Sequence, residues 1–343
     1  MKNGDQPKVL VLLPANYSLH EIIAYNLEKL GYDALVINNE SFPFQYKNLG
    51  EKLKNFWVKT FQGDKSFKQR LRDERFLSSV KNFVNVNAYY DHILVIRADF
   101  FSLELIDFLR TKTKDFVSYH FDGLNRYPKA FEFIEKFDRF YVFDKKDIEL
   151  NPSFKLLPAT NFYFNYHPNN NGTEDKNLDF YFLCSYHESR NKPLLDFAAY
   201  AQQHNYTYDF EVIYASTNPP TSVIKKQLNC HTGYISFTDY LQKIKKSKYI
   251  LDLLISEHLG LSFRVFESLQ LKKKLITTNP TVKQYDFYHP NNIFVLDNNY
   301  EALEEFLKLP YHELEQEIVE KYSMENWLKY IFKTDPYSPI SLP

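Results

Sequence analysis

Residues 256–279 hold the most informative set of side chains in the chain. Gly260 and Ser262 precede an amphipathic stretch whose first turn contains Arg264 and whose second turn contains Glu267. Backbone N–H groups at the start of a helix attract phosphate, and an arginine there adds a fork of strong donors. A carboxylate three residues further on lies on the same helical face, where it can accept both hydroxyls of a ribose. The alternative is an exposed Arg–Glu pair on a surface helix.

A second polar turn follows the apolar run at residues 180–184. Ser185 and Arg190 lie between this expected strand and the helix after it. Parallel sheets bind ligands beyond the carboxyl ends of their strands, so both side chains are placed to meet a ligand. The alternative is a solvated loop in which Ser189 caps the next helix.

Candidate proton acceptors occur in the first half of the chain. Residues 118–128 run from an expected strand into a polar loop that contains His120 and Asp122. A carboxylate or imidazole at a strand terminus suits a general base that deprotonates an attacking hydroxyl. We predict Asp122 first, His120 second and Asp99 third. The alternatives are a simple Asp-Gly turn at Asp122, a buried core imidazole at His120 and a local ion pair between Arg97 and Asp99.

Several other chemistries are excluded by spacing. The ten histidines show no H-E-x-x-H pattern and no Cys/His quartet, so no structural zinc site is expected. The chain has no nucleophile elbow G-x-S-x-G, no phosphate-binding G-x-x-x-x-G-K-[ST] and no G-x-G-x-x-G after its first apolar run. Asp-x-Asp is also absent. We therefore expect no catalytic metal and no cofactor, with arginines and helix dipoles available to stabilise negative charge instead.

The elements that must position these residues alternate between strand and helix. Near-continuous apolar strands separated by amphipathic helices are typical of buried parallel sheets. The predicted strands cover residues 8–13, 34–37, 92–96, 116–120, 139–143, 180–184, 208–214, 249–254, 274–277 and 293–295. The predicted helices cover residues 22–30, two within 46–82, then 103–109, 129–137, 193–203, 238–246, 262–271, 300–308 and 312–333.

The alternation is interrupted once, at residues 166–178, where Asn, Pro, Gly and acidic residues replace the apolar periodicity. We predict an α/β protein with two Rossmann-like, doubly wound domains facing a cleft, at residues 1–165 and 179–311. The segment 166–178 is the expected linker, and residues 312–343 form a helix and tail.

Composition narrows the class of protein. The 343 residues are 44% hydrophobic and 17% aromatic, enough apolar material for large cores. Lys and Arg number 42 against 43 Asp and Glu, and this balance argues against binding nucleic acid through phosphate neutralisation. Two cysteines indicate reduced thiols in a cytoplasmic protein. No apolar run approaches the length of a membrane span or a signal peptide.

Residues 46–82 combine basic and aromatic side chains. The set comprises Trp57 and the cations Lys47, Lys52, Lys54, Lys59, Lys65, Lys68, Arg70, Arg72 and Arg75. Cationic helices with aromatics can lie on anionic lipid headgroups, which would make the protein peripheral on the cytoplasmic face of the inner membrane. The alternative is a solvated helical face.

The second half also carries a family resemblance. Gly260, Ser262, Arg264 and the Phe266-Glu267 pair are followed in order by the string KLITTN at 274–279. This series resembles a stretch of bacterial GT-B-fold glycosyltransferases of capsule and lipopolysaccharide assembly. The downstream strings at 286–288 and 291–293 look like its continuation, and the resemblance is clearest over the last third of the chain.

The resemblance implies roles for individual residues. Arg264 would bind the donor diphosphate and Glu267 the nucleoside ribose. The donor site would also involve Gly260, Ser262 and Asn279, together with Ser185 and Arg190 from the first strand-turn of the second domain. Asp122 falls in a loop similar to the Tyr-x-x-Asp loop that faces the cleft, and the tail helix would cross back to the first domain. One departure is that Leu259 stands where many retaining members have a second glutamate, with Glu257 a poor substitute.

The sequence thus predicts a metal-independent glycosyltransferase that moves a sugar from a nucleotide-sugar donor to a hydroxyl of a bacterial surface glycan or lipid-linked glycan. Two alternatives remain open at this point. One is a non-catalytic, two-domain protein that closes on a sugar or nucleotide. The other is an epimerase or phosphorylase built on the same double fold.

Overall fold

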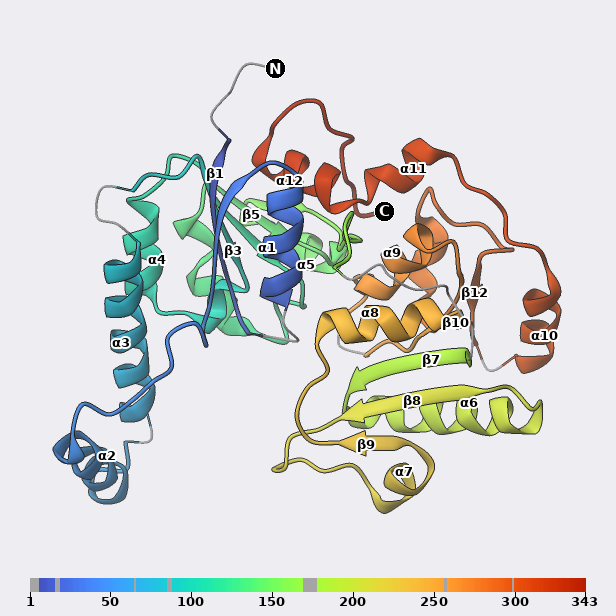
Figure 1. Ribbon diagram of the computed structural model, residues 1–343, viewed down its shortest axis with the longest axis horizontal. Helices are drawn as coiled ribbons and strands as arrows, with labels where there is room; N and C mark the ends of the chain where they lie inside the picture. The colour runs from blue at the N-terminus through green and yellow to red at the C-terminus, as the bar shows by residue number, and fades with distance from the viewer. Residues whose placement is uncertain are drawn as a thin grey trace.

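The protein folds into two halves that each contain one parallel sheet covered by helices (Figure 1). The computed structural model describes residues 6–15, 19–64, 66–84, 88–168, 178–255, 258–297 and 299–343. Asn16, Glu257 and most of the predicted linker, residues 169–177, lie outside these ranges. No helix within them is both long and apolar enough to cross a membrane.

The first sheet has six parallel strands in the order β2-β1-β3-β4-β5-β6. Its strands are β1 (Lys8–Leu13), β2 (Asp33–Asn38), β3 (His92–Ile96), β4 (Phe116–His120), β5 (Arg139–Val142) and β6 (Leu156–Pro158). The central strands are buried on both faces, which is why their sequences are apolar without alternation. The strand order reverses between β1 and β3.

The second sheet also has six parallel strands, in the order β12-β11-β10-β7-β8-β9. They are β7 (Leu178–Ser185), β8 (Tyr208–Ile213), β9 (Asn229–His231), β10 (Ser247–Asp252), β11 (Lys274–Thr277) and β12 (Ile293–Val295). Counted from β7, this is the 3-2-1-4-5-6 order of a dinucleotide-binding fold, with its switch point between β7 and β10. The predicted fold class is confirmed.

Helices connect consecutive strands, and several begin where the sequence supplies a capping side chain. Ser102, Thr221, Ser236 and Asn299 each accept a hydrogen bond from a backbone N–H in the first turn of the helix they precede. The helices of the two halves are α1 (Leu19–Lys29), α2 (Leu49–Phe61), α3 (Phe67–Phe83), α4 (Leu103–Arg110), α5 (Lys145–Leu150), α6 (Asn191–Gln203), α7 (Ser222–Gln227), α8 (Phe237–Lys246), α9 (Phe263–Gln270) and α10 (Tyr300–Lys308).

The C-terminal segment packs against the first half, although it follows the second half in sequence (Figure 1). It contains α11 (Gln316–Lys321) and α12 (Met324–Phe332). The Trp327 indole N–H donates to the Thr160 carbonyl at 2.9 Å, and the Tyr330 hydroxyl donates to the Pro158 carbonyl at 2.9 Å. The Tyr322 hydroxyl donates to Asp286 of the second half at 2.6 Å. The tail therefore contacts both halves.

Two predicted helices differ from the structure. Residues 129–137 form two 3₁₀ turns, η2 (Pro128–Glu132) and η3 (Ile134–Lys136), in place of one α-helix. The predicted helix 312–333 is interrupted because Ser323 begins α12 as its cap, accepting from the Asn326 N–H at 3.1 Å. The short elements β6, β9 and α7 were not predicted.

Candidate functional site

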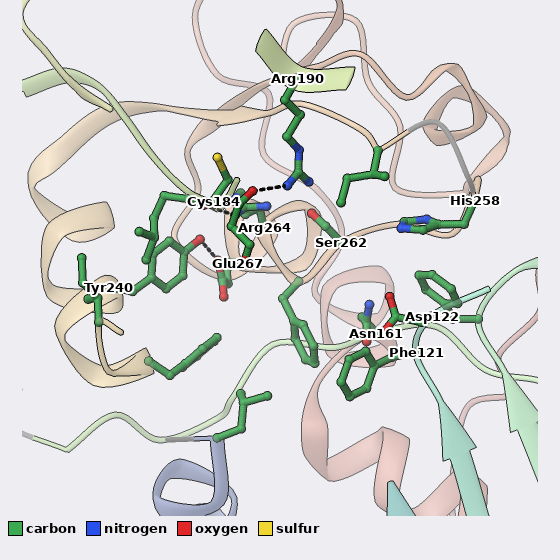
Figure 2. A pocket seen from close by; sticks show the side chains of 18 of the residues that line it. Phe121, Asp122, Asn161, Cys184, Arg190, Tyr240, His258, Ser262, Arg264 and Glu267 are labelled. Atoms are coloured by element: carbon green, nitrogen blue, oxygen red, sulfur yellow. Dashed lines mark hydrogen bonds between the residues drawn. The ribbon is translucent and has the colours of Figure 1, made fainter. Parts of the chain in front are cut away.

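A cavity of about 260 Å³ lies between the two halves, at the carboxyl ends of strands from both sheets. Figure 2 shows Asp122 and Asn161 of the first half on one side and Arg264 and Glu267 of the second half on the other. Both halves line the cavity. The lining residues are Leu19, Phe121, Asp122, Arg126, Phe143 and Asn161 of the first half, and Leu183, Cys184, Ser185, Arg190, Ile235, Phe237, Tyr240, Ile255, His258, Ser262, Phe263, Arg264 and Glu267 of the second half.

Arg264 lies in the first turn of α9, as predicted, with its guanidinium packed over the ring of Phe182 at 4.9 Å. Its Nη2 donates to the Leu183 carbonyl of β7, and its Nη1 lies 3.4 Å from the Asp252 carboxylate. The buried Nε–H has no hydrogen-bond partner among the residues that the structure describes. A buried donor without a partner is costly, so Arg264 keeps hydrogen-bonding capacity that a ligand can use.

Glu267 is 1% exposed, which contradicts the interpretation of an exposed Arg–Glu surface pair. The Tyr240 hydroxyl of α8 donates to the Oε2 atom of Glu267 at 2.5 Å, whereas the buried Oε1 atom has no partner within the described part of the chain. Burial raises the pKa of this carboxyl to about 7. A desolvated carboxylate with one unused oxygen is a strong acceptor for a ligand hydroxyl.

Asp252, which sequence reasoning missed, organises the start of α9 from the end of β10. Its carboxylate accepts from the Ser262 hydroxyl at 2.8 Å and from the Thr277 hydroxyl at 3.0 Å. Ser262 therefore uses its side chain to join α9 to the sheet. The only sequence signal was the position of Asp252 at a strand terminus.

Ser185 and Arg190 lie on the same cavity, directly after β7. The Arg190 Nε donates to the Leu253 carbonyl at 2.8 Å, which fixes the guanidinium beside the β10 end of the cavity (Figure 2). Two arginines, one after each strand flanking the switch point, make this part of the cavity electropositive.

On the opposite side, Asp122 belongs to a buried ionic network. The Arg97 guanidinium, 1% exposed, donates to both oxygens of Asp99 at 2.9 and 2.8 Å and also to Asp122. Arg97 packs over the Tyr127 ring at 3.9 Å and adopts a left-handed backbone with φ of 57°. A buried, sandwiched guanidinium of this kind holds the Asp122 carboxylate in one orientation.

Asp122 faces the cavity with its other oxygen 3.7 Å from Arg126. Burial raises the pKa of the Asp122 carboxyl, and the positive charges of Arg97 and Arg126 oppose the rise. His258, from the second half, also lines the cavity, and burial lowers the pKa of its imidazole. The carboxylate is thus a stronger base than an exposed aspartate.

Four predicted site residues do not line the cavity. Asp99 forms the local ion pair with Arg97 that was its alternative interpretation, at 2.8 Å. His120 is fully buried beneath it, 3.6 Å from Asp99, and burial lowers the pKa of its imidazole to about 3. A substrate cannot reach this ring, so we withdraw His120 as a candidate base. Asn279 is 1% exposed. Its side-chain amide donates to the Leu259 carbonyl and accepts from the Thr281 N–H. Gly260 packs against Phe143, which a Cβ would meet at 2.4 Å.

The loop that carries Gly260 is held by the first half of the protein. The Leu259 N–H donates to Asp144 at 2.7 Å, and the Asn161 amide donates to the Leu261 carbonyl at 2.9 Å. Asn161 and His258 were not predicted, because nothing local to either residue indicates a partner 100 or more positions away. Among the described residues, no three His, Cys, Asp or Glu side chains are grouped to hold a metal ion.

The two parallel sheets facing a shared cavity define a GT-B-like double Rossmann fold, and comparisons with known proteins agree. No protein-family model and no curated protein matches the chain. A solved glycosyltransferase from Rickettsia africae ESF-5 is similar over 97% of this chain and 100% of its own length, at 12% identity and a TM-score of 0.53.

A second similar structure is an alpha-glucosyltransferase in complex with UDP and a 13-mer DNA containing a central A:G mismatch. It covers 95% of this chain and 95% of its own, at 10% identity and a TM-score of 0.55. A UDP-N-acetylglucosamine 2-epimerase from Rickettsia bellii has 9% identity over 91% and 90% of the two chains, with a TM-score of 0.44. At these identities the shared property is the fold.

Proposed function

We propose that the protein is a glycosyltransferase that uses a nucleotide-sugar donor. The observation that carries this proposal is the pair of buried, incompletely bonded groups on α9, Arg264 Nε and Glu267 Oε1, beside an interdomain cavity. Buried polar atoms without partners are uncommon in folded proteins, and these two belong to residues that line the same cavity. A cation near the start of a helix and a carboxylate one turn later match a phosphate joined to a ribose.

In this proposal the donor lies mainly on the second half. Arg264 and Arg190 bind the diphosphate at the N-terminal end of α9, with the Ser185 turn beside it. Glu267 accepts a ribose hydroxyl through Oε1, while Tyr240 holds Oε2. Preorganised cations and helix dipoles stabilise the negative charge that develops on the departing diphosphate, so the proposed reaction needs no metal or cofactor.

Asp122 is the proposed base. The acceptor hydroxyl gives its proton to the free carboxylate oxygen of Asp122, and the hydroxyl oxygen forms a new bond to the anomeric carbon as the bond to the diphosphate breaks. Arg97 positions the carboxylate through its other oxygen. The raised pKa of Asp122 favours uptake of the proton.

The proposed acceptor is a hydroxyl of a bacterial surface glycan, such as capsule, lipopolysaccharide or a lipid-linked precursor, assembled in the cytoplasm. One similar structure was solved with DNA. A formal net charge of −1 makes a DNA acceptor unfavourable here, because DNA binding depends on neutralising phosphates.

A thermal-shift screen with UDP-, GDP-, dTDP-, ADP- and CMP-linked sugars tests the donor. One nucleotide family should raise the melting temperature, and Glu267→Ala and Arg264→Ala should abolish the shift. Release of nucleotide diphosphate in the presence of acceptor then separates a transferase from a binding protein. Unchanged calorimetric affinity in both variants would exclude the proposed donor site.

A further inference from the structure

Helix α2 carries a row of large apolar side chains on its solvent-facing side. Five of them are 52–77% exposed: Leu49, Leu53, Phe56, Trp57 and Phe61. At 100° per residue they occupy one continuous face, since their spacings of four, three, one and four residues return to the same side of a helix. Exposed apolar residues are normally scattered, so this many on one short helix mark a binding surface. We call it the α2 apolar face.

The rest of the protein packs against the opposite side of α2. Val58 is the buried residue of the helix, and Glu51 forms an ion pair with Arg75 of α3. The Tyr46 hydroxyl accepts from the Asn55 amide at 3.1 Å. The α2 apolar face therefore points away from the protein, and no described part of the chain covers it.

Lysines border the α2 apolar face on both sides. Lys52 and Lys59 fall along one edge of the helix and Lys54 along the other, and all three are exposed. The Lys54 ammonium lies 5.6 Å from the centre of the Phe67 ring, a cation–π contact with the first residue of α3. The one acidic residue of the helix, Glu51, is already paired with Arg75. The border of the face is therefore positively charged.

The position of α2 in the fold suits contact with a large, flat partner. Figure 1 shows α2 at one extreme of the long axis of the molecule, beyond the first sheet and far from the second half. It follows the carboxyl end of β2, and in a parallel sheet this is the same edge from which Asp122 extends after β4. A flat partner that binds α2 would therefore lie on the same edge of the first sheet as Asp122, the proposed base.

We propose that α2 is a membrane-docking helix that lies in the interface of an anionic bilayer. Leucine and aromatic side chains enter the boundary between headgroups and acyl chains, and the flanking lysines contact anionic headgroups. An anionic lipid surface can take up the apolar side chains and attract the lysines that border them. A protein partner would need acidic residues placed to match these lysines, whereas a bilayer needs no such pattern. This proposal is independent of the proposed donor chemistry.

The two tryptophans provide a direct measurement. Trp57 is half-exposed on the α2 apolar face, whereas Trp327 is 1% exposed in the core. Adding phosphatidylglycerol vesicles to the full chain should shift the tryptophan emission to the blue, and only Trp57 can contribute to this shift. Vesicles of pure phosphatidylcholine should give little shift, and Trp57→Phe should remove it altogether.

Co-sedimentation with the same vesicles separates the two contributions to binding. Leu53→Gln, Phe56→Gln and Phe61→Gln combined should lower the affinity for anionic vesicles by at least about tenfold, because inserted apolar area is lost. Lys52→Gln with Lys59→Gln should lower it by about 25-fold on anionic vesicles only, since each cation near such a surface contributes about a fivefold factor. The matched control is Tyr234→Gln, which removes a side chain of 70% exposure from the second half and should leave binding unchanged.

Three results would overturn the proposal. The first is sedimentation with neither vesicle type, and the second is equal affinity for anionic and neutral vesicles. The third is a dimer that forms with increasing protein concentration and is dissolved by the triple glutamine variant without any vesicle binding, because α2 would then pair with a second copy. All substituted side chains are solvent-exposed, so an unchanged melting temperature confirms that each variant is folded.

Discussion

Each half of the protein contains an arginine beside the cavity, Arg97 buried and Arg264 partly exposed, and the two differ in how completely the protein satisfies them. Arg97 directs its guanidinium to Asp99 and Asp122, with a two-pronged contact to Asp99. The Arg264 Nη2 donates to the Leu183 carbonyl and its Nη1 lies 3.4 Å from the Asp252 carboxylate, but its Nε–H has no partner among the described residues. Every guanidinium nitrogen of Arg97 donates to a carboxylate, so that network is closed at the guanidinium, whereas the Arg264 network is incomplete.

The difference separates positioning from binding. A closed network contributes to stability and fixes geometry, because removing one member leaves other charges buried and unpaired. An incomplete network costs stability in the free protein and recovers it when a ligand supplies the missing partners. We therefore assign Arg97 to orienting Asp122 and Arg264 to holding a ligand.

The largest expected effect is on turnover. Asp122→Asn should reduce transfer about 10³-fold, because an amide cannot take up the acceptor proton. Donor affinity by calorimetry should stay within about twofold, since the donor lies on the second half. The control Asp107→Asn changes an exposed carboxylate paired with Lys136 and should leave turnover unchanged. Wild-type turnover in Asp122→Asn would remove Asp122 as the base.

The second effect is on stability and compares the two arginines directly. Arg97→Met should lower the free energy of unfolding by about 3–5 kcal/mol, because Asp99 and Asp122 lose their shared counter-ion. Arg264→Met should cost about half as much or less, because Asp252 keeps hydrogen bonds from Ser262 and Thr277. Equal losses in urea denaturation would show that the two networks do not differ as described.

A smaller effect concerns ligand binding alone. Arg264→Lys keeps the positive charge but replaces a planar fork with a single ammonium, so nucleotide affinity should fall about 10-fold to 100-fold. Isothermal titration with the nucleotide identified by the screen measures the change. Arg110→Lys, at an exposed pair with Asp138, is the matched control. A loss in the control equal to that in Arg264→Lys would refute a specific role for Arg264.

The smallest effect is a pH-dependent gain in stability from Glu267→Gln. Burial raises the pKa of Glu267 to about 7, whereas an unfolded glutamate titrates near pH 4. The folded state thus holds a proton that the unfolded state releases, and this stabilising contribution is lost as pH rises through about 7. At pH 8 the variant should be more stable than the wild type by about 1–3 kcal/mol.

At pH 4 the stabilities of Glu267→Gln and the wild type should converge, because Glu267 is protonated in both states. Nucleotide affinity at pH 8 should nevertheless fall in the variant, since the amide is a weaker acceptor than the carboxylate. Urea denaturation at both pH values and calorimetry at pH 8 measure these changes. A stability difference that is the same at both pH values would show that ionisation of Glu267 is not its cause.

The fold class and the position of α9 were predictable because they depend on local patterns. Apolar runs separated by amphipathic stretches specify parallel strands and helices, and Ser262 marks the start of α9. The spacing of Arg264 and Glu267 placed both on one face of that helix. Only the tertiary structure shows that Glu267 is buried, because α8 supplies Tyr240 from 27 positions away.

The failed predictions share a cause, which is that long-range contacts decide them. His120 follows the same strand pattern as its neighbours, but packing beneath Arg97 and Asp99 removes it from the cavity. The 129–137 segment has helical periodicity, but it connects two closely spaced strands through short 3₁₀ turns beginning at Pro128. Which face of α2 is covered likewise depends on α3 and not on the α2 sequence.

Gly260 allows a close approach between the two halves. The Phe143 ring occupies the space that any larger side chain would need, at 2.4 Å from where a Cβ would stand. Glycine has a hydrogen atom where every other residue has Cβ, so the Phe143 ring fits against it, and a methyl group there would hold the halves further apart. The width of the cavity, and with it the distance from Asp122 to the donor side, therefore depends on position 260 having no side chain.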